Sequence, residues 1–528
     1  MAHSTINNVA LKKLEGLIDT PLPPDVLQNI LRDLERIVYM EPKNLRALST
    51  YAQYQLKNGR PDLAGEASSR VMKLSPHNIG GKSLLLRCYV MIGDNQRALE
   101  ISKSLPISKI SDITTLEILG NTLVFNEEYA LAKNIFKKLT TIKPNNSNYH
   151  TNLGSMHHYC NEVDNAEKAL IRACHENPTD FRAYWLLSQL RFATSQTNHI
   201  ELLEKQLPNV RQGTDASCYL HFGLAKEYED LKNFDKAFSH LKAGNAAKFD
   251  AKSYTIEDNR RLFSLIRKQY EKVVDIHSKG YECSEPIFII GMPRSGTTLL
   301  EQVIGDDSTV FRAGELQDFY RAMCMHAGSK GGKWPLKKVL ASVPSFDFKS
   351  LGKSYIELTR PRTGQTLFFI DKMPENFLYL GFINKALPNA KFIHISRDPL
   401  DTCLSNFKML FGAEMYPYSY NMDTLAAYYY QYQKLMKYWN DAFGNKILNI
   451  NYEDLIQDTT SQFSAIFQHC HLQWQEERLK YHQKNTPVGT ASAAQVRQPI
   501  YTTSIKKWQK FEPHIAPLKQ SLGKLGVI

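Results

Sequence analysis

Residues 286–304 read PIFIIGMPRSGTTLLEQVI, and this stretch decides the architecture of the C-terminal half of the chain. Its first five residues form an apolar, β-branched run of the length expected for a buried parallel strand. The run gives way to GMPRSGTT at 291–298, and apolar residues then recur at 299, 300, 303 and 304, which is the spacing of a helix. The sequence therefore predicts a strand, a glycine-bearing loop and a helix in succession.

The loop between the predicted strand and helix has the features of an anion site. Backbone N–H groups at a helix N-terminus lack partners, and the helix dipole adds to their attraction for negative charge. Gly291 and Gly296 keep the separation of the pattern G-x-x-x-x-G-K-[ST], but Thr297 stands in place of its lysine. Because the cradle for a β/γ-phosphate pair is then incomplete, we expect a different anion, with Arg294 beside it, rather than an ATPase or GTPase. A glycine turn that only joins strand to helix is the alternative.

A 34-residue period organises the first 250 residues. Prolines at 42, 76, 144 and 178 are 34, 68 and 34 residues apart, which is one, two and one unit of the tetratricopeptide period. Small and apolar residues follow the same period, as in Leu119-Gly120 and Leu153-Gly154. We predict an all-α tetratricopeptide solenoid over residues 1–250 and a connecting helix or linker over 251–283; a helical bundle with coincidental prolines is the alternative. Such a solenoid offers a concave surface to a peptide or a partner protein.

Residues 284–528 alternate between buried strands and helices. Apolar runs at 367–370, 391–396 and 447–452 predict further strands, with helical patterns between them. This alternation indicates an α/β P-loop-type domain with a mostly parallel sheet flanked by helices. Ligands of such sheets lie beyond the carboxyl ends of the strands, so functional polar residues are expected there.

A second anion site is predicted after the strand 391–396. Arg397 follows that strand directly, and Ser405 lies eight residues further on, in the next predicted helix. An arginine at a strand end and a serine two turns into the following helix can converge on one phosphate, with the guanidinium giving bidentate contacts. A salt bridge from Arg397 to Asp398 or Asp401 is the structural alternative.

These two motifs, in this order, resemble those of the PAPS-dependent sulfotransferases, and PRSGTT after a buried strand is closest to the tyrosylprotein sulfotransferase-like branch. The resemblance extends from Glu285 onward. It implies that 3′-phosphoadenosine 5′-phosphosulfate (PAPS) is the sulfuryl donor. The 5′-phosphosulfate is expected on the loop and the 3′-phosphate on the second site, with contacts from Arg294, Ser295, Gly296, Thr297, Thr298, Arg397 and Ser405.

The resemblance also implies a general base. Glu315 resembles the catalytic glutamate of the tyrosylprotein branch, and a carboxylate within reach of an acceptor hydroxyl can take its proton. The family often has a second acidic residue next to this glutamate, where this chain has Leu316. Glu301 and Asp318 are therefore the neighbouring alternatives for the base.

The remaining site residues are also implied by the resemblance. Lys372, which follows the predicted strand 367–370, would stabilise charge on the departing oxygen together with Arg294; a surface charge is the alternative for this lysine. Tyr452 resembles a tyrosine that packs near the nucleotide. A small-residue-rich segment from 488 onward resembles a lid over the cofactor, with candidate contacts from Ser492, Arg497 and Lys507. The tyrosine-dense stretch 416–438 is expected to pack helices and to supply part of an acceptor pocket.

Composition and cysteine usage bear on the compartment and the partners. The 528 residues carry a net charge of +12, which suits an enzyme of a polyanionic nucleotide and equally nucleic-acid or anionic-surface binding. Eight scattered cysteines without a C-x-x-C pair favour a reducing compartment over a disulfide framework or a zinc site. Without a signal peptide or an apolar run of about 18 residues, no membrane span is expected, and we expect a cytoplasmic, bacterial version of the family.

These inferences combine into one functional hypothesis. We expect a sulfotransferase that moves a sulfuryl group from PAPS to an acceptor hydroxyl without a metal ion. A protein tyrosine is the acceptor that the branch and the solenoid suggest, and a small alcohol, phenol or saccharide is the alternative. A nucleotide kinase or NTPase with a degenerate loop, and a repeat scaffold with an inactive domain, are the other classes. The expected partners are PAPS, the acceptor and a protein on the solenoid, with no nucleic acid; a homodimer is left open.

Overall fold

A computed structural model describes residues 10–18, 20–249, 254–276, 279–329, 335–412, 415–483, 498–500 and 504–528. Backbone contacts divide the chain into two compact units, Met1–Pro144 and Asn145–Ile528. The domain boundaries expected from the sequence, at residues 250 and 283, separate all the repeats from the sheet. The backbone contacts instead group the last repeats with the sheet, so the two divisions differ. Within the described part, no helix is long and apolar enough to span a bilayer.

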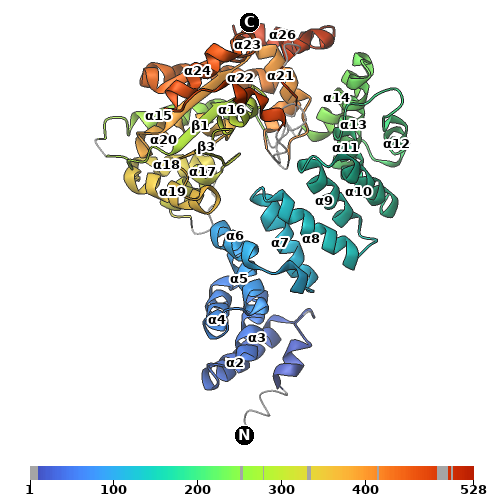
Figure 1. Cartoon of the computed structure of the whole chain (residues 1–528), viewed down its shortest axis with the longest axis vertical. Helices are drawn as coiled ribbons and strands as arrows, with labels where there is room; N and C mark the ends of the chain where they lie inside the picture. Colours follow the sequence, from blue (N-terminus) through green and yellow to red (C-terminus); the bar gives the residue numbers. More distant parts are fainter. Residues whose placement is uncertain are drawn as a thin grey trace. The chain divides into compact units, whose positions relative to one another are not determined.

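The first unit is a row of helices in which consecutive helices pack together (Figure 1). Helix starts follow from the sequence, because Asn44, Asn78, Asp94 and Asp112 each accept a backbone N–H of the first turn that follows. The described helices are α2 (Pro24–Met40), α3 (Leu45–Lys57), α4 (Pro61–Leu74), α5 (Ile79–Met91), α6 (Asn95–Ser104), η1 (Ile107–Lys109), α7 (Ile113–Phe125) and α8 (Tyr129–Ile142).

The repeats continue into the second unit with the same period. Its repeat helices are α9 (Ser147–Tyr159), α10 (Val163–Glu176), α11 (Phe181–Gln189), α12 (Ile200–Glu204), η2 (Leu207–Asn209), α13 (Asp215–Asp230) and α14 (Phe234–Lys248). The alanines at the 34-residue spacing, Ala64, Ala98, Ala132 and Ala166, are all fully buried. A Cβ added at Gly154 would lie 2.6 Å from Cγ of Leu170, so this glycine allows α9 and α10 to approach closely. The predicted tetratricopeptide architecture is confirmed.

The sheet of the second unit has five strands in the order β2-β3-β1-β4-β5, and every described strand pair is parallel. The strands are β1 (Pro286–Gly291), β2 (Val310–Arg312), β3 (Phe368–Asp371), β4 (Lys391–Ser396) and β5 (Ile447–Asn451). The predicted fold class is confirmed, and four of these strands lie within one residue of their predicted bounds. β2, a three-residue edge strand, was not predicted.

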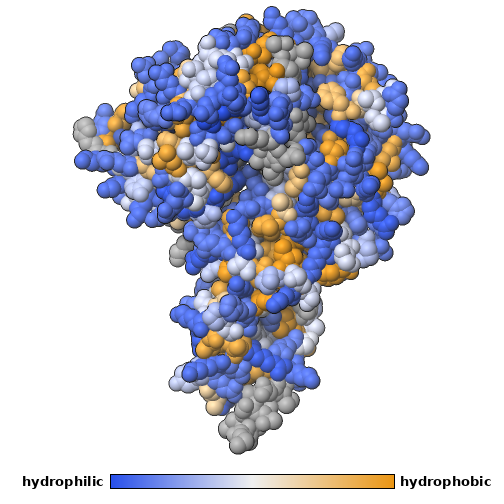
Figure 2. Space-filling model, in the orientation of Figure 1, coloured by the Kyte–Doolittle hydropathy of each residue, from blue (hydrophilic) through white to orange (hydrophobic). Residues whose placement is uncertain are grey.

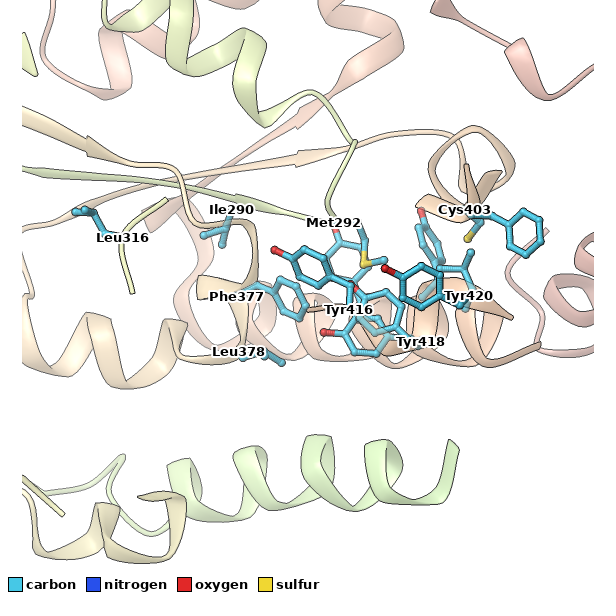
Figure 3. Close-up of a cluster of buried hydrophobic side chains, with 14 of the residues drawn as sticks. Ile290, Met292, Leu316, Phe377, Leu378, Cys403, Tyr416, Tyr418 and Tyr420 are labelled. Atoms are coloured by element: carbon cyan, nitrogen blue, oxygen red, sulfur yellow. The ribbon is translucent and has the colours of Figure 1, made fainter. Parts of the chain in front are cut away.

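Helices cover both faces of the sheet, and side chains of β1 alternate between the two cores. Ile287 and Ile289 pack with α16 (Thr297–Ile304) and α24 (Thr459–His469), whereas Phe288 and Ile290 belong to the larger core against α22 (Met422–Phe443). Figure 3 shows Ile290 and Met292 of this larger core near Phe377, Tyr416 and Tyr418. Such burial on both faces explains the uninterrupted apolar run of the strand.

The rest of the second unit is helical. Helix α15 (Ile256–Glu271) agrees with the connecting helix expected before the sheet. The further described elements are α17 (Asp318–His326), α18 (Leu336–Ser342), η3 (Val343–Ser345), α19 (Phe348–Thr363), η4 (Pro374–Leu378), α20 (Leu380–Ala386), α21 (Pro399–Phe407), η5 (Pro417–Tyr420), η6 (Gly444–Lys446), α23 (Tyr452–Gln457), η7 (Glu476–Gln483), η9 (Lys507–Phe511) and α26 (Ala516–Lys524).

Candidate active site

The loop after β1 has the backbone that its sequence predicts. Gly296 precedes the first residue of α16 with φ of +115°, and a Cβ there would lie 2.7 Å from Cδ2 of Tyr452, so both the backbone and the contact require glycine. Arg294 also has a positive φ, +70°, which is unusual for a residue with a side chain. No side chain caps α16 within the described residues. The N–H groups of Leu299 and Leu300 donate to the backbone oxygen of Gly296, and those of Thr297 and Thr298 at the start of the helix suit an anion.

The two predicted anion motifs meet because β4 lies beside β1 in the sheet. Nε of Arg294 donates to Oγ of Ser405 over 3.2 Å, and a terminal nitrogen of Arg397 donates to the backbone oxygen of Arg294 over 3.4 Å. The guanidinium of Arg397 also stacks on the ring of Tyr452, at 4.7 Å from the ring centroid. Four residues predicted to hold the nucleotide are thus in one cluster.

Arg397 is held in place by more than the cluster. Its terminal nitrogen donates to the backbone oxygen of Ser504 over 2.6 Å and lies 3.4 Å from a carboxylate oxygen of Asp401. Arg397 therefore forms the salt bridge to Asp401 that was the structural alternative, and it also belongs to the cluster. Nε of Arg397 is buried with no hydrogen-bond partner among the described residues, which leaves a cationic donor for a ligand.

Two residues predicted to act in catalysis, Lys372 and Glu315, are in contact, and Lys372 follows β3, the other neighbour of β1. Nζ of Lys372, which follows β3 and is fully buried, lies 2.6 Å from a carboxylate oxygen of Glu315. Glu301 is 3.9 Å from the same ammonium and accepts the backbone N–H of Gly314. The side chain of Glu315 is 36% exposed and that of Glu301 only 5%, so Glu315 is the carboxylate that an acceptor can reach.

The third candidate for the base, Asp318, begins α17. Burial raises the pKa of its carboxyl to about 6, while Arg321 and Arg362 oppose that shift. The structure gives no ion pair between Asp318 and Lys372, whereas Glu315 and Lys372 are in direct contact. Glu315 is therefore the better placed of the two.

A cavity of about 770 Å³ adjoins the first cluster. Its lining includes most of the predicted nucleotide contacts, namely Arg294, Gly296, Thr297, Thr298, Arg397, Ser405, Tyr452 and Lys507. Glu315 and Lys372 are not in the lining. Ser295 is buried inside the loop, where its hydroxyl has no described partner. Ser492 and Arg497, the other two lid candidates, lie outside the described residues.

Lys507 contributes a desolvated cation to this cavity. Burial, and then the nearby charge of Lys408, lower the pKa of its ammonium to about 8. Asp401 accepts the backbone N–H groups of Lys506 and Trp508 over 2.7 and 2.9 Å, so the helix that carries Ser405 also anchors the segment that carries Lys507.

Two groups near the site were not predicted. One is the repeat side of the cavity, where Trp185, Phe222, Lys226 and Glu229 join the lining. Nothing in the repeat pattern marks these positions, because only the docking of the repeats onto the sheet brings them there. The other is Glu375, which accepts a hydrogen bond from the Tyr428 hydroxyl over 3.2 Å. Burial, and then the charge of Glu315, raise the pKa of Glu375 to about 7. The position of Glu375 in the sequence, three residues after Lys372, could have identified it as a residue near the site.

The chain is similar to two protein families over separate segments. Residues 286–476 match the family described as "Sulfotransferase family", and residues 27–148 match "ChAPs (Chs5p-Arf1p-binding proteins)". An uncharacterized protein of Aquifex aeolicus is 30% identical over 338 residues, which are 61% of this chain and 44% of the relative. The chain thus spans less than half the length of that relative. Protein-tyrosine sulfotransferase 2 of Gallus gallus is 23% identical over 290 residues, covering 50% of this chain and 77% of the relative.

Solved structures resemble each half. The sulfotransferase domain of the Synechococcus PCC 7002 olefin synthase is 20% identical with a TM-score of 0.33, covering 47% of this chain and 94% of that one. YrrB, described as a TPR protein with an unusual peptide-binding site, is 11% identical with a TM-score of 0.30, covering 40% of this chain and 97% of that one. Residues 286–476 thus match the sulfotransferase family, and they follow tetratricopeptide-like repeats in the same chain.

Proposed function

We propose that the chain is a PAPS-dependent sulfotransferase that moves a sulfuryl group to an acceptor hydroxyl, with a protein tyrosine as the acceptor. The observation that carries this proposal is the position of two clusters on either side of one strand. Arg294, Arg397 and Ser405 meet on one side, and the Lys372–Glu315 pair forms on the other. An anion-binding cluster next to a carboxylate–ammonium pair suits transfer of a charged group to a hydroxyl.

The residues of the cavity fit a nucleotide with two anionic ends. Seven cationic and three acidic side chains are in its lining, so the wall has an excess of positive charge. The uncapped start of α16 suits the 5′-phosphosulfate, while Arg397 and Ser405 suit the 3′-phosphate. The bound donor supplies the sulfuryl group and leaves as adenosine 3′,5′-bisphosphate.

The chain's own side chains divide the remaining work. Glu315 accepts the proton of the acceptor hydroxyl as the new oxygen–sulfur bond forms. Lys372 and Arg294 neutralise the negative charge that develops on the departing phosphate oxygen. Because Lys372 is fully buried and already in contact with Glu315, it needs little reorganisation to do so.

The acceptor side of the site is aromatic and acidic. Tyr416 and Tyr418 are buried near Phe377 (Figure 3), and Tyr418 stacks on Tyr428 with ring centroids 3.6 Å apart. Tyr428 in turn donates to Glu375. We propose that this cluster borders the acceptor, since aromatic walls bind a phenol ring and exclude water. The similarity to the chicken protein-tyrosine sulfotransferase supports a tyrosine acceptor.

The first unit is proposed to bind a partner protein. Its helices expose several large apolar side chains, among them Tyr39, Val90, Met91 and Phe125. Figure 2 shows apolar patches on the visible face of this part of the chain. Exposed apolar surface on a repeat array is typical of protein recognition. The eight free cysteines support a reducing compartment, and we propose the cytoplasm.

The test uses the purified full chain with sulfur-labelled PAPS and a fractionated host extract. We expect label in protein tyrosine and release of adenosine 3′,5′-bisphosphate. Arg294→Ala and Lys372→Ala are expected to reduce turnover strongly with the circular dichroism spectrum kept, whereas exposed Lys353→Ala is the matched control. Label found only in small molecules would show that the acceptor is a small molecule and not a protein tyrosine. Near-normal turnover in both variants, or tighter binding of magnesium–ATP than of the bisphosphate, would contradict the proposal.

A further inference from the structure

The cavity beside the donor loop has a second wall that comes from the repeats. We call Trp185, Phe222, Lys226, Glu229 and Leu241 the repeat wall; they belong to α11, α13 and α14. All of them line the same cavity as Arg397 and Ser405. A site built only from the sulfotransferase domain would lack this side.

The repeats are firmly seated against the sulfotransferase domain within the second unit. Nδ2 of the buried Asn245 donates to the backbone oxygen of Phe407 over 2.9 Å. Phe238 stacks with Phe407, with ring centroids 6.1 Å apart, and with His514 at 4.8 Å. These contacts fix α14 against the last residue of α21, so the repeat wall is a constant part of the cavity.

The repeat wall meets the cavity at the end predicted to hold the 3′-phosphate. Lys408 forms an ion pair with Glu229 of α13. It follows Ser405 by three residues, so the two side chains leave nearby positions on one helical turn. The carboxylate of Glu229 thus faces the part of the cavity where an anion would sit between Ser405 and Arg397.

Charge from the repeats also reaches this cavity. Two of its seven cationic side chains, Arg191 and Lys226, come from the repeats. Each has an acidic partner: Nζ of Lys226 lies 2.8 Å from Asp230, and Arg191 lies 2.6 Å from Glu167. Lys226 and Glu229, one turn apart on α13, therefore present opposite charges to the same space.

An acceptor is not the natural occupant of this side. An acceptor hydroxyl must reach Glu315, and this residue is not in the lining. The repeat wall shares the cavity with the loop after β1 and with Arg397 and Ser405. The wall is therefore in position to act on the nucleotide end of the donor.

We propose that the repeat wall is part of the donor site, in which Lys226 attracts and Glu229 repels the 3′-phosphate of an adenosine 3′,5′-bisphosphate group. The inference rests on the proposed function, because it takes the same nucleotide as ligand. It makes the last repeats a working part of the enzyme, with donor affinity set in part by helix α13.

The test is calorimetric titration of the full chain with adenosine 3′,5′-bisphosphate at low ionic strength. Lys226→Ala is expected to weaken binding roughly fivefold, since a partly screened charge contact is lost. Glu229→Gln is expected to tighten binding roughly threefold, because a like charge leaves the wall and Lys408 is freed for the phosphate. Lys242→Ala and Asp235→Asn are the matched controls: both are exposed on α14 and outside the lining, and Asp235 pairs with His514, so it tests a contact between repeats and domain alone.

Opposite signs from two residues of one helix cannot come from a general loss of stability. Unchanged bisphosphate binding in both Lys226→Ala and Glu229→Gln, or weaker binding in both, would overturn this inference. The proposed function would still stand in that case, provided that the wild-type chain binds the bisphosphate. A wild-type chain that does not bind the bisphosphate would overturn the proposed function and this inference together.

Discussion

At the scale of single residues, two carboxylates face one ammonium group and differ in burial and in their other contacts. Glu315 is in contact with Lys372 and partly open to solvent, whereas Glu301 is buried and also accepts the N–H of Gly314. The accessible carboxylate suits proton transfer, and the buried one suits the support of the loop after β2.

Substitution separates these tasks. Glu315→Gln is expected to lower turnover by roughly 10²- to 10⁴-fold, because an amide cannot take the acceptor proton, with bisphosphate affinity unchanged. Glu301→Gln is expected to lower the free energy of unfolding by about 1–3 kcal/mol, because buried Lys372 loses a compensating charge. Single-turnover rates and thermal unfolding measure the two effects. Full turnover in Glu315→Gln would show that a neighbouring residue, and not Glu315, is the base.

Lys507 is expected to make donor binding depend on pH. Its ammonium, with the pKa lowered to about 8, is charged below that pH and neutral above it. An anion prefers the charged form, so affinity for adenosine 3′,5′-bisphosphate is expected to fall as pH rises beyond 8, by at most roughly tenfold per unit. Lys507→Arg keeps its charge and should flatten the profile between pH 7 and 9. A wild-type profile that is flat over this range would remove Lys507 from the donor site.

At the scale of elements, the strand–loop–helix unit depends on one glycine. Gly296→Ala places a Cβ against the Tyr452 ring at a φ of +115°, so we expect a loss of about 1–3 kcal/mol in stability together with loss of bisphosphate binding. Gly523→Ala in α26 is the control, because its Cβ would meet nothing within 4 Å. Thermal unfolding and titration check both variants, and normal binding by Gly296→Ala would contradict the role of the loop.

Local sequence was enough for the elements and for the motifs at their ends. The apolar runs placed four strands, and the proline period placed the repeats, because burial and helix pairing leave periodic traces. Strand order leaves no such trace, so nothing in the sequence by itself showed that β3, which precedes Lys372, and β4, which precedes Arg397, flank β1. Short β2 and the repeat wall depend on tertiary docking, which is why they were missed.

At the scale of the whole molecule, the compact units predict where the chain can be divided. A chain of residues 145–528 keeps the repeat wall and the sheet together, so we expect it to fold and to bind adenosine 3′,5′-bisphosphate. A chain of residues 254–528 loses Phe238 and Asn245 from the surface around Phe407, so we expect aggregation or weaker binding. Light scattering and titration compare them. Equal binding by both chains would show that the repeats do not support the site.

The attachment of residues 504–508 to Arg397 and Asp401 has a consequence for biosynthesis. Ser504 accepts from Arg397, and Lys506 and Trp508 donate to Asp401, across more than a hundred residues of sequence. Residues 504–508 leave the ribosome more than a hundred residues after Arg397 and Asp401, when the loop and the repeats have already emerged. During synthesis Arg397 therefore emerges before the backbone oxygen of Ser504 that accepts its hydrogen bond, so this cluster is complete only after residues 504–508 have followed.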